Sequence, residues 1–199
     1  MPPKAGLNKA IIVQAAADLV NTEGVDGLTL NRLANKLGVQ TPSLYNHIDG
    51  LPGLQRELSL LNAHRLGDRL EKAAVGKSGP EAIRQVAQAY RAYIKDNPGV
   101  YLSSLRASGS LPQGDEALEA EEDRIVEIGL AVVASFGLNG EAGLHAVRGL
   151  RSVVHGFATL EIAGGFGLPL DCDESFQRLV QMLISALQIQ QSRENSEKE

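Results

Sequence analysis

Apolar residues recur at helical spacing along almost the whole chain, and this regularity most limits the folds that the chain can adopt. Between Asn8 and Glu23, for example, the spacing gathers Ile12, Ala16 and Leu19 on one side. Runs of alternating β-branched and polar residues bounded by hairpin turns, which would indicate strands, are almost absent. The sequence therefore predicts an all-α protein.

Glycine and proline residues divide this periodic sequence into about nine helices. The breaks at 76–79 and 97–98 are the clearest, and residues 164–169 form a linker. The predicted helices cover residues 8–23, 30–37, 41–47, 51–75, 80–97, 99–108, 116–136, 139–164 and 173–191.

Composition predicts an aliphatic core and excludes several kinds of site. The 199 residues are 43% hydrophobic but only 4% aromatic, without tryptophan. The single cysteine, Cys172, excludes a disulfide framework and any multi-cysteine metal site, and it fits a reducing compartment. No window reaches the roughly 20 apolar residues of a membrane span, and no signal peptide is recognisable. We therefore expect a soluble, cytoplasmic protein without membrane contact.

The N-terminal quarter differs in charge from the remainder. Residues 1–56 hold five basic and four acidic side chains, whereas the remainder holds 14 basic and 20 acidic ones. This mild basicity is too weak to indicate nucleic acid by itself, so a nucleic-acid function needs a motif.

Residues 28–48 contain such a motif, two short amphipathic helices that meet at Gly38. Gly38 has the backbone freedom for a sharp turn, Thr29 is placed to cap the first helix, and Ala34 permits close helix approach. Pro42 stands early in the second helix, where its missing N–H costs nothing. The outward side of the second helix is dense in hydrogen-bonding groups that suit a major groove. These residues are Gln40, Thr41, Ser43, Tyr45, Asn46 and His47.

Residues 8–54 resemble the DNA-binding domain of TetR-family transcriptional regulators. The most specific part is the pattern Leu-Gly-Val-x-x-x-x-Leu-Tyr-x-His followed by an apolar residue, here Ile48. Residues 150–157, with Leu160 and Glu161 beyond, resemble the C-terminal domain of a TetR subgroup with a similar His-Gly element. Elsewhere the agreement is limited to length and helical content.

The resemblance implies a role for each matching residue. Tyr45 and His47 match positions that grip phosphates, and Thr29 matches a phosphate-contacting cap. Asn31 stands at a position that reaches bases in some members. Bases or the thymine methyl are contacted at the positions of Gln40, Thr41, Pro42, Ser43 and Asn46.

One position departs from the family pattern. Many members place a lysine at the start of the fourth helix as a phosphate contact, whereas Leu51 stands here and Asp49 adds a negative charge. Losing one phosphate contact is expected to flatten the salt dependence of DNA affinity by about one unit. For Arg32 and Lys36, a solvated helix face and a phosphate contact both remain open.

The long C-terminal helices carry apolar stripes that suit a four-helix dimer interface, and the resemblance favours a homodimer. The same stripes would equally close the core of a single subunit. Their members are Leu144, Val147, Leu150, Val154, Phe157 and Leu160, and, in the last helix, Phe176, Leu179, Val180, Leu183, Ile184 and Leu187.

A pocket for a small organic effector is expected among the helices between Pro80 and Gly164. For each candidate an ordinary core or surface position is the alternative, and for His155 the alternative is a core histidine bonded to a carbonyl or carboxylate. The candidates are Tyr90, Tyr93, Tyr101, Leu105, Arg106, Arg124, His145, Arg148 and His155.

The constellations of common enzymes are missing. None of the four histidines follows an acidic residue at the spacing of a di-metal site, and no phosphate loop, nucleophile elbow or dinucleotide fingerprint occurs. We therefore expect no catalysis, metal or cofactor.

The sequence thus predicts a ligand-responsive transcriptional repressor that binds a palindromic operator in double-stranded DNA as a homodimer. Residues 1–52 would form the helix-turn-helix DNA-binding domain, 53–191 the ligand-binding and dimerisation domain, and 192–199 a disordered tail. The alternative is a helical dimer that acts through protein partners or ligand sequestration, with a vestigial DNA reader.

Overall fold

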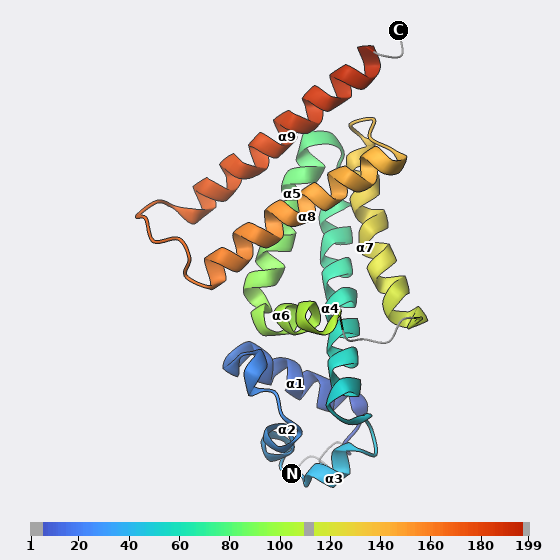
Figure 1. Cartoon of the computed structure of the whole chain (residues 1–199), viewed down its shortest axis with the longest axis vertical. Coiled ribbons are helices and arrows are strands. Elements are labelled where there is room, and N and C mark those ends of the chain that lie inside the picture. Colours follow the sequence, from blue (N-terminus) through green and yellow to red (C-terminus); the bar gives the residue numbers. More distant parts are fainter. Residues whose placement is uncertain (1–5, 110–113, 197–199) are drawn as a thin grey trace. The chain divides into compact units, whose positions relative to one another are not determined.

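The computed structural model describes residues 6–109 and 114–196, and all regular elements within these ranges are helical (Figure 1). The elements are α1 (Lys9–Glu23), a short 3₁₀ helix η1 (Val25–Gly27), α2 (Leu30–Leu37), α3 (Thr41–Leu44), α4 (Gly50–Ala74), α5 (Gly79–Asp96), α6 (Pro98–Ala107), α7 (Glu116–Ala134), α8 (Gly140–Ile162) and α9 (Cys172–Ser196).

The predicted all-α fold of about nine helices is confirmed, and two boundaries differ from the predicted ones by more than two residues. α3 ends at Leu44, because residues 45–47 continue as turns in which the N–H of His47 donates to the Leu44 carbonyl (2.9 Å). α9 continues to Ser196, so residues 192–196 are helical where the sequence predicted disorder. Polar residues such as Gln and Glu extend a helix readily without apolar neighbours. The rest of the predicted tail, 197–199, lies outside the described residues.

The chain divides into two compact units, and α4 and α7 contribute residues to both. The first unit comprises residues 1–64 and 97–119, and the second comprises 65–96 and 120–199. The predicted functional division at residue 52 stays a prediction, and α4 runs through that position without interruption.

In the first unit, α6 is fixed on α1 through its first turn. The side-chain oxygen of Asn21 accepts hydrogen bonds from the backbone N–H groups of Gly99 (2.9 Å) and Val100 (3.0 Å). Two N–H groups that a helix start leaves unpaired are thereby satisfied. A Cβ at Gly99 would overlap the backbone carbonyl of Val20, so only glycine permits this approach of α6 to α1.

In the second unit, a buried arginine joins three helices. Arg91 of α5 is only 2% exposed and donates to both carboxylate oxygens of Glu161 in α8 (2.7 and 2.6 Å). It also pairs with Asp173 at the start of α9 (2.7 Å) and lies over the rings of Phe157 and Phe176. The hydrogen bonds from Arg91 hold the pKa of Glu161 below its ordinary value. The pair is therefore ionised at neutral pH, and it ties α5, α8 and α9 together.

We expect Gly99→Ala to lower the free energy of unfolding by about 1–3 kcal/mol, because the added methyl group must push α6 away from α1. Gly109→Ala is the matched control, since Gly109 follows α6 and a Cβ there meets open space. Urea unfolding followed by circular dichroism measures both variants. Equal midpoints for the two variants and the natural chain would contradict the importance of the Gly99 contact.

Candidate nucleic-acid interface

α2 and α3 form a helix-turn-helix whose local geometry follows the predicted pattern. Thr29 Oγ1 accepts the N–H of Arg32 (3.2 Å) and caps α2, while Gly38 ends α2 in the left-handed region at φ 67°. The N–H of Val39 then donates to the Ala34 carbonyl (3.0 Å), which closes the turn. Within the first unit, α2 packs against α1 and α3 packs against α2 (Figure 1).

The second helix of this motif and the turn after it have one buried and one open side. Leu44 and Ile48 point into the core that α1, α2 and α4 share. Among the described residues, none of the polar side chains opposite them hydrogen-bonds to another part of the chain. We call the following residues the reader: Gln40, Thr41, Pro42, Ser43, Tyr45, Asn46 and His47.

The reader residues differ in exposure. Gln40, Pro42, Tyr45 and Asn46 are exposed, whereas Thr41, Ser43 and His47 are half-buried, and Asn31 of α2 is exposed as well. The phenol of Tyr45 is thus a surface group. The predicted DNA contacts themselves stay a prediction.

Internal ion pairs engage most of the positive charge near the reader. Arg32 pairs with Glu23 and also donates to the Gly27 carbonyl (3.4 Å), so it joins α2 to the end of α1. Lys36 is exposed and is the one basic residue described before position 57 without an ion pair. The other pairs are Lys9–Glu57 at 3.0 Å, Arg56–Glu57 at 2.8 Å and Arg56–Asp115 at 2.5 Å.

Leu51, which replaces the usual lysine, serves packing instead of charge. It lies in the first turn of α4, half-buried against the core of the first unit, while Asp49 just before α4 is exposed. This end of α4 therefore offers DNA no cation.

The predicted pocket residues are divided between the two units. Tyr101 and Leu105 belong to α6 in the first unit, where Arg106 pairs with Asp26 (2.6 Å). The second unit holds Tyr90, Tyr93, Arg124, His145, Arg148 and His155.

Within the second unit these candidates have different surroundings. Tyr90 and Tyr93 are buried, and burial raises the pKa of Tyr93. Arg124 is engaged by the carboxylates of Asp68 (2.7 Å) and Glu71 (2.6 Å). His145 and Arg148 are exposed.

The imidazole of His155 is half-buried. Burial, with the nearby charge of Arg151, lowers its pKa. The effector pocket as a whole stays a prediction.

The apolar stripes of the last two helices close the core of the subunit over much of their length. Leu150, Val154 and Phe157 of α8 are buried, and so are Phe176, Val180, Ile184 and Leu187 of α9. A second stripe on α9 extends outward from this core. It consists of Leu179, Met182, Leu183, Ala186 and Ile189, and the spacing of these residues was the available signal. Leu179 and Leu183, which the sequence placed in the predicted stripe, are half-buried members of it, whereas Met182, Ala186 and Ile189 are exposed and were not predicted.

No helix among the described residues is long and apolar enough to cross a membrane. Residues 6–109 and 114–196 also bring together no group of three or more His, Cys, Asp or Glu side chains suited to a metal ion.

Comparisons with known proteins agree with this architecture. A family model described as the tetracyclin repressor-like C-terminal domain matches residues 83–183. The HTH-type transcriptional regulator YobS of Bacillus subtilis (strain 168) is 35% identical over 190 residues, which cover 95% of this chain and 97% of YobS. The tetracycline repressor protein class D of Escherichia coli is 31% identical over 160 residues, which cover 79% of this chain and 67% of the repressor.

A solved structure shows the same fold. A TetR variant from Acinetobacter baumannii AYE in complex with minocycline superposes with a TM-score of 0.70 at 22% identity, covering 93% of this chain and 98% of that one. The helical fold and the helix-turn-helix together define a helix-turn-helix regulator of transcription. With the family model and YobS, they show that the chain belongs to the TetR family of transcriptional regulators.

We expect Tyr45→Phe and His47→Ala each to weaken binding to an operator fragment by about five- to tenfold, because each removes one predicted phosphate contact. Fluorescence anisotropy at constant salt measures the affinity, and circular dichroism checks that helix content is unchanged. His145→Ala is the matched control, since His145 is an exposed histidine of the second unit. Unchanged affinity in both reader variants would count against the assigned reader.

Leu51→Lys should strengthen DNA binding at low salt and steepen the slope of log affinity against log salt by about 0.9, the value for one added phosphate contact. Leu51→Gln is the control, because it removes the same packing without adding charge. A titration at four salt concentrations gives both slopes. Identical slopes for the two variants would show that this position lies away from the phosphates.

Proposed function

We propose that this protein is a ligand-responsive repressor that binds a palindromic operator in double-stranded DNA as a homodimer. The observation that carries the proposal is the reader, a set of polar side chains on a rigid helix-turn-helix with no hydrogen-bond partner among the described residues. Buried polar groups need partners, whereas exposed ones of this density suit base edges and phosphates.

The reader also indicates how specificity would arise. Its flanking cations are engaged in ion pairs, so Lys36 supplies most of the free positive charge on the described part of this surface. Phosphate contacts give affinity without sequence information, while contacts to base edges discriminate between sequences. Binding by this reader should therefore depend weakly on salt and strongly on operator sequence.

The outer stripe of α9 supports the homodimer. Met182 and Ile189 are exposed large apolar residues, and a water-facing apolar stripe on a long helix suits a partner helix. On α8, Cβ atoms at Gly149 and Gly156 would meet open space, so the subunit itself does not require glycine there. Glycines inside a helix cost about 1 kcal/mol each relative to alanine, and a close partner helix would explain them.

A small-molecule effector is the remaining part of the proposal. The tetracycline repressor is named for such a response, and the Acinetobacter baumannii structure holds minocycline. In a dimer, an effector can release the operator only by binding more tightly to the conformation in which the distance between the two readers does not match the operator half-sites. The chemical class of the effector of this chain follows from its target genes, not from these relatives.

The alternative of a vestigial reader is favoured by two observations, the replacement of lysine by Leu51 and the exposed Asp49. It predicts a helical dimer without sequence-specific DNA affinity.

The test is selection of genomic DNA fragments by the full chain at two salt concentrations, followed by sequencing. We expect enrichment of one palindrome whose half-sites are about one helical turn apart, weaker at high salt and absent for the Tyr45→Phe/His47→Ala variant. The chain is denatured and refolded beforehand, which strips any bound effector. No enrichment by well-folded protein after this step would overturn the repressor in favour of the vestigial reader.

A further inference from the structure

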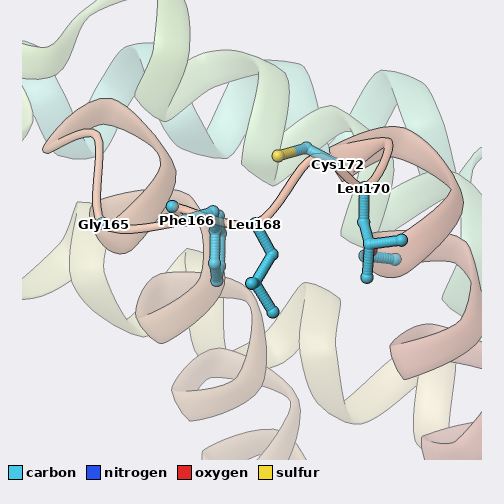
Figure 2. A pocket seen from close by; sticks show the side chains of 7 residues that line it. Gly165, Phe166, Leu168, Leu170 and Cys172 are labelled. Carbon is cyan, nitrogen blue, oxygen red and sulfur yellow. The ribbon is translucent and has the colours of Figure 1, made fainter.

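The connection between α8 and α9, residues 163–171, presents apolar side chains to solvent, and we call it the arm. Leu168 is 74% exposed and Leu170 is 69% exposed, while Phe166 is partly covered. Figure 2 shows these three side chains extending to the same side of the backbone, with Gly167 and Pro169 between them in the sequence. The arm thus carries two leucines that the core of the subunit does not cover, beside Phe166, which is partly covered.

The arm is held at both ends instead of hanging loosely. The ring of Phe166 lies against that of Phe157 in α8, with the ring centroids 4.7 Å apart. The N–H of Gly165 donates to the Leu160 carbonyl (2.8 Å). At the other end, Asp171 accepts the N–H of Glu174 (2.8 Å) and caps α9. Both ends of the arm are thus anchored on the subunit, and the two leucines between them face solvent.

The arm is continuous with the outer stripe of α9. Phe166, Leu168 and Leu170 line an open pocket of about 240 Å³ together with Cys172 and Ser175 (Figure 2). Ser175 precedes Leu179 by one helical turn and Met182 by two, so it lies on the side of α9 that carries the outer stripe. A single surface therefore runs from the arm along α9.

We propose that the arm packs against a second copy of this chain and extends the dimer interface beyond α8 and α9. This inference rests on the homodimer of the proposed function. Exposed apolar side chains stabilise an assembly when a partner covers them, and in the proposed homodimer the partner that covers the α9 stripe is another copy.

Charge on the two helices complements this arrangement. In a twofold dimer with antiparallel α8 helices, the end of α8, where the arm begins, lies opposite the start of the partner's α8. The arm leads into Asp171, Asp173 and Glu174. Asp173 and Glu174 pair with Arg91 (2.7 Å) and Arg178 (2.6 Å) of the same subunit, whereas Asp171 has no ion pair among the described residues and is the carboxylate available to a partner. The first half of α8 carries exposed Arg148 and Arg151, neither of which pairs with a carboxylate among the described residues. Acidic flanks also disfavour an anionic membrane as the occupant.

The test compares the self-association of the full chain with that of the Leu168→Ser/Leu170→Ser variant by sedimentation velocity across a concentration series. We expect dimerisation at least about tenfold weaker, because two leucines lose their covered environment. Thermal unfolding at concentrations where the chain is monomeric should be unchanged, since both side chains are exposed in the subunit. Val75→Ser is the matched control, because Val75 is 69% exposed after the end of α4.

Arg148→Glu tests the charge argument independently and should also weaken dimerisation. If the natural chain stays monomeric at every concentration, both the homodimer and the proposed role of the arm are wrong. If the natural chain dimerises and the arm variant dimerises with the same affinity, only the proposed role of the arm is wrong. If the arm variant dimerises normally but loses binding to phosphatidylglycerol vesicles, the arm is a membrane contact and the proposal is wrong.

Discussion

The buried guanidinium of Arg91 is the interaction on which the second unit depends. Its partners, Glu161 and Asp173, stand at the end of α8 and the start of α9, so one side chain sets the positions of both helices and of the arm between them. Removing one partner from a buried pair typically costs about 3–5 kcal/mol, because the other charge is left uncompensated. The two aromatic rings beside the guanidinium exclude water from the pair and strengthen it further.

The packing of the first unit depends on the close approach of the α6 and α1 backbones, whereas that of the second unit depends on a buried charge. Asn21 and Gly99 hold the start of α6 on α1, and α1 supplies the core against which the helix-turn-helix packs. The reader therefore stands on a rigid base, while its outward side chains keep their hydrogen-bonding groups for a partner. Its low free charge shifts the expected recognition from phosphates toward bases, which is consistent with a regulator that must find one operator among many sites.

Helices and caps were predictable because their causes lie within a few residues. Thr29 marks the start of α2 and Gly38 its end, through hydrogen bonds between residues no more than five positions apart. The apolar residues before them recur at helical spacing. The stripe Leu150, Val154 and Phe157 was harder to interpret, because spacing shows that a face is apolar but not what covers it. The same ambiguity hid Met182 and Ile189 in the outer stripe of α9, because Leu179 and Leu183 fall into one predicted stripe with the buried residues of the same helix.

The sequence by itself determined the all-α fold, the helix-turn-helix and the resemblance to the TetR family, because these follow from local periodicity, turn chemistry and a short motif. Only the tertiary structure decided which charges are neutralised, where glycine is indispensable and which apolar residues stay in water. Arg91 and Glu161 stand 70 positions apart, and Asn21 and Gly99 stand 78 apart. Pairings at such separations depend on how the helices pack, so no local pattern encodes them.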